Sequence, residues 1–228
     1  MSKCDQCIVR QLSSLKALSK EELLKMTQCK ISETVKKGTV LFEEGEHLDG
    51  VFCIKDGACK LTKLSSNGKD QIIKLIKKGD LLGQRSVISE EPVNLTATAL
   101  SDMEICFIPK NEIIAAVKDN LTFTTEIIRD VCHELKDANN AMLNMAQHNV
   151  TQRLANALLH LENTFGLDSE GYIDLYLSRE EIANMIGTAT ESAIRLLSSF
   201  KKDQLIELDG KRIKILDAKK LAFMVDDL

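Results

Sequence analysis

The first residues whose chemistry can be named are Cys4 and Cys7, a C-x-x-C pair in the stretch MSKCDQCIVRQL. Two thiolates at this spacing can hold one metal ion or cluster from a short segment. The pair is also compatible with a reversible disulfide or with half of a zinc site. Because the surrounding segment is polar and offers little core, we do not expect these two cysteines to be buried. They are candidate ligands or redox groups.

The chain has seven cysteines in all, an odd number spread too widely for the framework of a small secreted disulfide protein. Four of them lie among apolar residues and are predicted to be small buried hydrophobic residues. These are Cys29, Cys53, Cys59 and Cys132. The seventh, Cys106 in the run EICFI, fits the same role on its local sequence.

A second group of candidate residues lies in the stretch GTATESAIR, and consists of Thr188, Thr190, Glu191, Ser192 and Arg195. Arg can make a bidentate contact to guanine, Glu can accept from the amino group of cytosine, and Ser and Thr can bond bases or phosphates. Glu191 and Arg195 are also four residues apart, the spacing of a simple ion pair on a helix. The eight Lys or Arg against four Asp or Glu between residues 192 and 220 favour DNA contact.

Two short helices are predicted to position this second group. Ser178, with Glu181 three residues later, is a capping-box signal that opens a helix ending at a break, Gly187. A second helix is predicted from about Thr190 to Lys202. Two short helices joined by a turn that contains glycine form the helix-turn-helix pattern.

The second of these helices is predicted to pack through Ile194, Leu197 and Leu205, which leaves its opposite face open. The stretch LIELDGKRIKIL that follows is typical of two strands joined by an Asp-Gly turn. A β-hairpin in this place is the wing of a winged helix-turn-helix. We therefore predict a DNA-binding domain of this type over residues 149–228.

Between Cys29 and Pro109 the sequence is typical of an all-β sandwich or an antiparallel β-roll. Short runs rich in β-branched residues alternate with glycines at positions 38, 45, 57, 68 and 79, and SNGKD contains an Asn-Gly hairpin signal. Ser19 and Glu22 form a capping-box signal for a short helix before the roll. The predicted fold class is α+β, with a cysteine-bearing segment over residues 1–18 and the β-roll over residues 19–109.

A long helical run without glycine or proline extends from Lys110 to Phe165. Six apolar residues in it are spaced 3, 4, 3, 4 and 3 apart, the seam of a coiled coil. These residues are Ile128, Val131, Leu135, Ala138, Met142 and Met145. We predict a dimerisation helix over residues 110–148 and a homodimer. The alternative is that the stripe packs on the β-roll, because the seam is shorter than three to four heptads.

Composition narrows the classes of function. A chain of 228 residues with 44% hydrophobic residues is long enough for two modest domains. Its net charge of -4 does not indicate nucleic-acid binding, so DNA contact would need a local basic patch. No apolar run reaches the roughly 20 residues of a membrane span, which predicts a soluble cytoplasmic protein.

The sequence does not favour an enzyme. It has no nucleophile-elbow, Walker A, GxGxxG or H-E-x-x-H pattern. A thiol oxidoreductase remains a remote alternative, but it needs the C-x-x-C pair in a βαβ unit that this sequence lacks.

The order of β-roll, long helix and winged helix-turn-helix, together with the segment GTATESAIRLLSSFKKDQLI, resembles the Crp/Fnr family of transcription regulators. The resemblance covers nearly the whole chain. It implies that Glu191 and Arg195 read the guanine-containing core of each half-site of a palindromic operator, that the β-roll receives the signal, and that RNA polymerase is a partner. Ile194 stands where the fumarate-nitrate regulators have Ser and the cyclic AMP receptors have Gly, which leaves the outer bases of the operator open.

The same resemblance speaks against a cyclic nucleotide as the signal. Family members that bind cyclic AMP use a Glu for the ribose and an Arg-Ser pair for the phosphate, because a buried phosphodiester needs a cation and donors. Here Gln84 stands in the place of that Glu, and Val93 and Asn94 stand in the place of the Arg-Ser pair. Arg85 lies one position away from the expected Glu.

The oxygen-sensing members of the family bind an iron-sulfur cluster through N-terminal cysteines and one cysteine in the β-roll. By this resemblance Cys4, Cys7 and Cys106 are metal ligands, whereas Ser13 replaces the third N-terminal cysteine. The fourth ligand is open: Cys29 and Asp5 are candidates, and the fourth iron could also have no protein ligand. The implied signal is redox state, oxygen or nitric oxide.

Other signals stay open beside the cluster. A thiol or disulfide switch and an unknown small molecule in the β-roll are the main alternatives. Haem is a minor one, because the four histidines are isolated in the sequence. They are His47, His133, His148 and His160.

Overall fold

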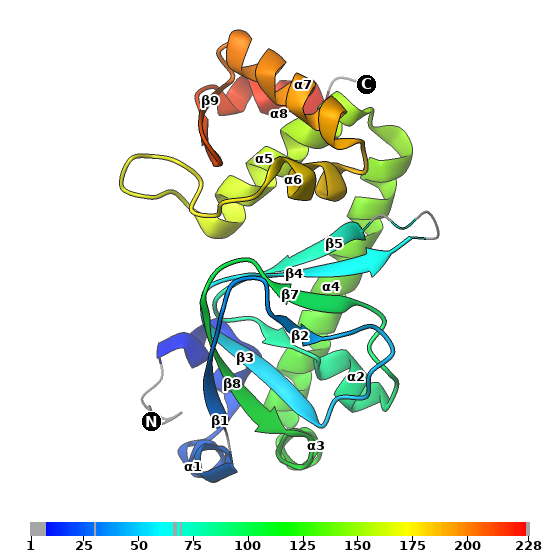
Figure 1. The fold of residues 1–228 in the computed structure, drawn as a ribbon. Coiled ribbons are helices and arrows are strands. Elements are labelled where there is room, and N and C mark those ends of the chain that lie inside the picture. Colours follow the sequence, from blue (N-terminus) through cyan, green and yellow to red (C-terminus); the bar gives the residue numbers. More distant parts are fainter. Residues whose placement is uncertain (1–7, 30, 66–67, 69, 227–228) are drawn as a thin grey trace. The chain divides into compact units, whose positions relative to one another are not determined.

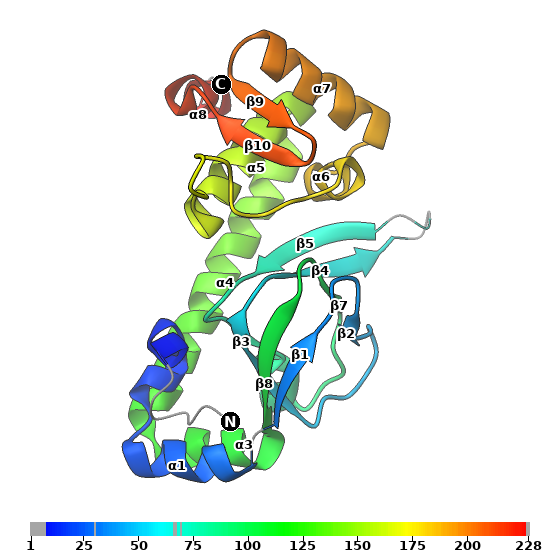
Figure 2. The same ribbon diagram turned by 60° about the vertical axis from the view of Figure 1, so that its left-hand side comes forward.

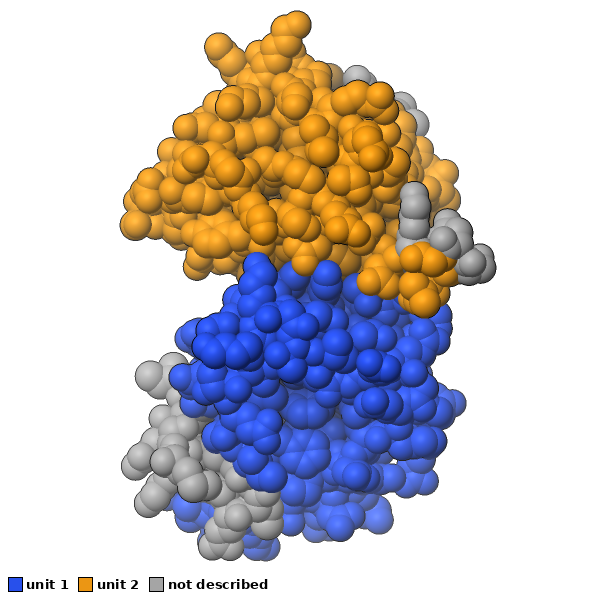
Figure 3. All heavy atoms as spheres, in the orientation of Figure 1, with its two compact units in different colours: residues 1–63, 74–137 blue, residues 64–73, 138–228 orange. Residues whose placement is uncertain are grey.

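The structure is a computed structural model that describes residues 8–29, 31–65, 68 and 70–226. It divides into two compact units (Figure 3). One contains residues 1–63 and 74–137, and the other contains residues 64–73 and 138–228. Within the described residues, no helix is long and apolar enough to cross a membrane.

An antiparallel β-roll forms where the sequence predicts it (Figures 1 and 2). Its two four-stranded sheets have the orders β1-β8-β3-β6 and β2-β7-β4-β5. The strands are β1 (Ile31–Val35), β2 (Val40–Phe42), β3 (Gly50–Asp56), β4 (Cys59–Leu64), β5 (Asp70–Ile76), β6 (Leu81–Leu82), β7 (Thr96–Ala99) and β8 (Met103–Pro109). A short helix, α2 (Gln84–Ser89), follows β6. The five glycines predicted as turns have φ between 78° and 95°, a region that glycine adopts without strain. Asn67 of the predicted Asn-Gly turn lies outside the described residues.

The roll has two cores because its β8 strand is buried on both faces. Met103 and Ile105 point into the core between the two sheets, whereas Cys106 and Ile108 point into a second core on the other side of β8. This second core is closed by helices before and after the roll. They are η3 (Ser14–Ala17), α1 (Lys20–Cys29), α3 (Lys110–Asp119) and the first turns of α4 (Leu121–Gln147). A further short helix, η2 (Ile8–Leu12), precedes them in the chain.

Polar side chains join the N-terminal helices to α4 and to Asn120, the residue directly before it. The Ser19 and Glu22 capping box forms as predicted, with the Ser19 N–H donating to the Glu22 carboxylate over 2.7 Å. The Asn120 side-chain amide donates to that same carboxylate and to the Ala17 carbonyl. Lys16 Nζ lies 2.9 Å from a carboxylate oxygen of Glu126. The segment that follows Cys7 in the chain therefore ends in polar contacts with α4.

The long helical run is two helices rather than the one predicted over residues 110–148. The chain breaks at Asn120, whose extended backbone ends α3 and whose side-chain oxygen accepts from the Phe123 N–H. This is an N-cap bond, and Asn is among the preferred N-cap residues. The six residues of the predicted dimerisation seam all lie on α4, which begins after this break.

The C-terminal unit contains the predicted winged helix-turn-helix. Its elements are α5 (Val150–Phe165), α6 (Arg179–Ile186), α7 (Thr190–Lys202), β9 (Ile206–Asp209), β10 (Arg212–Ile215) and α8 (Ala218–Asp226). A capping box between Asn149 and Gln152 opens α5, and Gly166 is its C-cap. Strands β9 and β10 pair antiparallel across the turn at Gly210. The apolar faces of α5, α6 and α7 supply most of this unit's core.

The capping box of α6 gives a test of local stability. Ser178 Oγ accepts from the Glu181 N–H over 3.1 Å, and the Ser178 N–H donates to the Glu181 carboxylate over 2.8 Å. We expect Ser178→Ala to lower the free energy of unfolding by about 1 kcal/mol, because one N–H of the first turn loses its acceptor. Urea unfolding followed by circular dichroism measures this. Ser198→Ala, on the exposed side of α7, is the control and should be close to neutral; equal stability of both variants would contradict the prediction.

Candidate DNA-binding interface

Helix α7 packs through one narrow stripe and leaves the rest of its surface open. Ala193, Leu197 and Phe200 are buried at spacings of four and three residues, and Leu205 closes the end of the stripe. The prediction for Leu197 and Leu205 is confirmed. The prediction for Ile194 is wrong, because its side chain is 44% exposed. Ala193, whose small side chain lets α7 approach the core closely, has the buried role instead.

The five polar residues predicted for DNA contact all lie at the N-terminal end of α7 or in the turn before it. Glu191 and Arg195 are exposed, and Thr188, Thr190 and Ser192 are half-buried. Arg195 Nη2 donates to Ser192 Oγ over 3.2 Å. Within the described residues Glu191 makes no ion pair, so the predicted alternative of a Glu191–Arg195 bridge does not form. The carboxylate and most of the guanidinium are available to a ligand.

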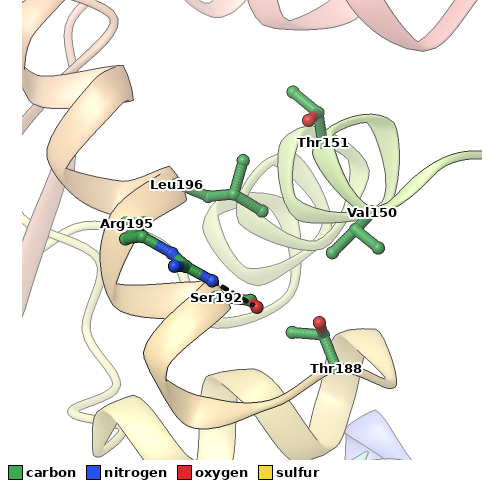
Figure 4. A pocket seen from close by; sticks show the side chains of 6 residues that line it. All are labelled: Val150, Thr151, Thr188, Ser192, Arg195 and Leu196. Atoms are coloured by element: carbon green, nitrogen blue, oxygen red, sulfur yellow. Dashed lines mark hydrogen bonds between the residues drawn. The ribbon is translucent and has the colours of Figure 1, made fainter.

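A pocket of about 350 Å³ lies beside these residues (Figure 4). Thr188, Ser192, Arg195 and Leu196 line one side of it, and Val150 and Thr151 of the first turn of α5 line the other. Backbone N–H groups in the first turn of a helix attract anions, and Arg195 adds a formal positive charge. The arrangement suits a negatively charged backbone that passes along the start of α7.

The wing is held to the rest of the domain by cations that bond backbone and carboxylate oxygens. Arg179 at the start of α6 donates to the Gly210 carbonyl at the wing turn over 2.8 Å. Arg212 on β10 bonds Asp168 over 2.9 Å, and its guanidinium lies 4.0 Å from the centre of the Tyr172 ring. Burial acts to raise the pKa of Asp168, but the Tyr172 N–H and Arg212 bond its carboxylate and hold the pKa near 2. The contact is therefore fully charged at neutral pH.

The predicted metal site lies mostly outside the described residues. Cys4, Cys7 and Asp5 are among the residues that the structure does not describe, and of Cys29 it gives only the backbone, at the end of α1. Cys106 is 4% exposed, and its Sγ lies 3.4 Å from Ser32 Oγ on the neighbouring strand β1. In the described part of the chain, no group of three His, Cys, Asp or Glu residues could hold a metal ion.

The remaining cysteines divide between buried and exposed. Cys53, which pairs with Cys106 across β3 and β8, and Cys59 are buried as predicted. Burial, with the nearby Asp80 charge, raises the pKa of Cys59 to about 12, so it stays a neutral thiol. The prediction for Cys132 is wrong: it is exposed on α4, where the nearby apolar residues Ile128, Val131 and Leu135 are exposed as well and do not belong to the core of this chain.

Gln84 and Arg85, which stand near the nucleotide-binding positions of the cyclic AMP receptors, bond side chains of this same chain. Gln84 is 7% exposed, and its amide donates to the Glu134 carboxylate of α4 over 3.3 Å. Lys74 Nζ lies 2.7 Å from the same oxygen. Arg85 bonds Glu91 over 3.2 Å and the Asn94 side-chain oxygen over 3.0 Å. Glu134 and Lys74 were not predicted from the sequence, because nothing local indicates that they meet.

These features define a class: a DNA-binding protein in which a β-roll precedes a long helix and a winged helix-turn-helix with an open recognition helix. The sequence matches two family models, the cyclic nucleotide-binding domain over residues 32–120 and the Crp-like helix-turn-helix domain over residues 152–224. The chain belongs to the Crp/Fnr family of transcription regulators, whose members are not enzymes.

Named relatives cover almost the whole chain. The transcriptional activator protein Anr of Pseudomonas protegens is 28% identical over 218 residues, which is 94% of this chain and 88% of that protein. The fumarate and nitrate reduction regulatory protein of Vibrio cholerae is 28% identical over 94% of this chain and 86% of its own length. The solved structure of FixK2 from Bradyrhizobium japonicum matches with a TM-score of 0.77 at 23% identity, over 86% of this chain and 96% of that one. This last likeness concerns the fold.

Proposed function

We propose that the protein is a homodimeric transcription regulator that reads a palindromic operator through α7 and responds to redox state, oxygen or nitric oxide. The observation that carries the DNA-reading part is the open face of α7, on which Glu191 and Arg195 are exposed without an ion pair between them. A guanidinium can bond the O6 and N7 atoms of guanine, and a carboxylate can accept from the amino group of cytosine. RNA polymerase is the partner expected of a regulator of this kind.

Ile194 is expected to set a base preference beside the guanine that Arg195 reads. Its exposed β-branched side chain lies next to Arg195 on the outside of α7. Neither a hydroxyl nor a bare glycine backbone is present there, so the residue has no hydrogen-bonding group to offer. An apolar side chain in the major groove favours the methyl group of thymine. We therefore expect a thymine near the guanine that Arg195 reads.

The dimer is proposed from the seam on α4. Ile128, Val131, Leu135, Met142 and Met145 are all large apolar side chains that are more than two-fifths exposed in the single chain. Such a continuous apolar stripe on one helix is costly in water and is covered when two copies pair in parallel. Pairing places two recognition helices on one DNA duplex, with half-sites about one helical turn apart.

We infer that Cys4, Cys7 and Cys106 are ligands of an iron-sulfur cluster. Their thiolates are the usual donors for such clusters, and a cluster supplies a redox-active centre when it is bound. Cys106 lies on the face of β8 that Leu15 and Leu18 cover, and these two residues come from the segment that continues from Cys7. The segment that contains Leu15 and Leu18, and covers this face of β8, thus follows the C-x-x-C pair directly in the chain.

Cys29 is the better supported of the two candidates for the fourth ligand. Helix α1 ends at Cys29, two residues before β1 begins. In β1, Ser32 pairs directly with Cys106. The backbone of Cys29 therefore lies a few residues from the neighbour of Cys106, whereas Asp5 lies outside the described residues.

The β-roll is not proposed to bind a cyclic nucleotide, although its family model carries that description. Gln84 bonds Glu134, and the guanidinium of Arg85 is already engaged with Glu91 and Asn94. The carboxylates of Glu91 and Glu134 thus lie directly beside Arg85 and Gln84. Anionic phosphate favours cations and hydrogen-bond donors, and not carboxylates.

The cluster is tested by purifying the protein without oxygen and recording its visible absorption, iron and sulfide. We expect a coloured protein that bleaches in air, complete loss of colour in Cys4→Ala and Cys106→Ala, and loss or marked instability of colour in Cys29→Ala. Cys132→Ala is the matched control, because Cys132 is exposed on α4 and should keep the colour. A colourless wild-type protein would overturn the cluster and leave the disulfide switch or a β-roll ligand as the signal.

A further inference from the structure

Arg153 lies at a point where three parts of the C-terminal unit meet. It belongs to the first turns of α5, and its guanidinium donates to three backbone carbonyls that come from two other places in the chain. Nε donates to the Ile186 carbonyl over 2.8 Å, Nη2 to the Gly187 carbonyl over 3.4 Å, and Nη1 to the His148 carbonyl over 3.0 Å. All these residues belong to the same compact unit.

The three carbonyls are those that the ends of helices leave without helical partners. Ile186 is the last residue of α6, Gly187 is its C-cap with φ of 64°, and His148 follows the last residue of α4. Helix C-termini carry partial negative charge, so a cation there is favourable. Arg153 thus satisfies the end of α4 and the end of α6 with one planar group.

The position of these carbonyls gives the contact a consequence for DNA reading. Gly187 begins the turn that leads into α7, which starts only three residues later at Thr190. His148 directly follows α4, the helix that carries the proposed dimer seam. The Arg153 guanidinium, bonded to the carbonyls at both helix ends, forms a rigid fork between them. This fork fixes the direction of the recognition helix α7 relative to α4, the helix proposed to pair with the second copy.

We propose that Arg153 is a positioning residue that sets the half-site spacing which the dimer accepts. The inference rests on the proposed dimeric operator reading. A planar guanidinium can hold three acceptors in fixed directions, whereas a lysine ammonium on a flexible stem cannot reproduce this geometry. Without the fork, α7 keeps its base-contacting side chains but loses its fixed direction relative to α4.

The test compares DNA duplexes that differ only in spacer length. Palindromes selected by the wild-type protein from random DNA are remade with the spacer lengthened or shortened by one base pair, which moves one half-site by about 3.4 Å and about a tenth of a turn. Binding is measured by fluorescence anisotropy for wild type, Arg153→Lys and Arg153→Met, with the melting temperature of each protein.

We expect the wild type to prefer its selected spacing strongly. In both variants, affinity for that spacing should fall about tenfold, while affinity for the altered spacings stays nearly the same, so the preference is reduced. Arg179→Met is the matched control: it removes one Arg-to-carbonyl bond to the wing turn and should leave the spacing preference unchanged.

Two other results are distinguishable from this one. Equal loss of affinity for every spacing, with a lower melting temperature, would make Arg153 a residue that only stabilises the domain and would overturn the proposal. An unchanged preference in both variants would overturn it too. If the wild-type protein selects no palindrome at all, the proposed function fails before this inference is reached.

Discussion

Replacing Leu135 by Glu should convert the dimer into monomers and abolish operator binding at nanomolar protein. Leu135 lies in the middle of the α4 seam and is 62% exposed in the single chain. In a parallel pair the two glutamates would face each other in an apolar interface, a cost on the order of 3 kcal/mol or more. This weakens dimerisation at least about 100-fold.

Sedimentation equilibrium of the wild type and the variant measures the effect. Asn140→Glu is the control, because Asn140 lies on the same helix outside the seam and accepts a charge there without facing its copy. If Leu135→Glu remained dimeric at the wild-type concentration, α4 would not be the dimer interface, and the exposed stripe would have another partner.

The second large effect is expected at Arg195. Arg195→Ala should cost roughly 1 to 3 kcal/mol of operator binding, or about 5- to 150-fold in affinity, because a bidentate contact to guanine is lost. The change should also remove discrimination at that one base pair, so that a guanine-to-adenine operator binds the variant as well as the original operator does. Competition binding against the two operators measures both quantities.

Lys202→Ala separates base reading from charge. Lys202 is exposed at the other end of α7, and its loss should weaken binding to all operators by a similar small factor and reduce the salt dependence. If Arg195→Ala behaved in the same uniform way, Arg195 would be a phosphate contact, and the assignment of α7 as a base-reading helix would be wrong.

The features that local sequence rules control could be predicted well. The capping boxes at Ser19 and Ser178, the turn glycines of the β-roll and the wing hairpin all formed, because each depends on residues only a few positions apart. The bounds of α7 were predicted for the same reason. The strand order of the two sheets, in contrast, depends on pairings far apart in the chain.

The errors have three different physical origins. Ile194 and Cys132 were predicted as buried because apolar residues usually are, yet both are exposed, on faces of α7 and α4 that do not pack against the core of this chain. The break at Asn120 was missed because an Asn N-cap ends one helix and begins the next without the glycine or proline that usually marks a helix end in the sequence. Arg153 and Glu134 were missed because their roles come from carbonyls and side chains that only the fold brings together.

The central claim, that α7 of a dimer reads a palindrome, is tested most directly by selecting binding sites from random double-stranded DNA with the purified protein. We predict enrichment of an inverted repeat whose half-sites contain guanine and lie about one helical turn apart, and, with Arg195→Ala, a weaker enrichment in which the preference for that guanine is lost. Enrichment of unrelated sequences, or of none, by the wild-type protein would contradict the claim.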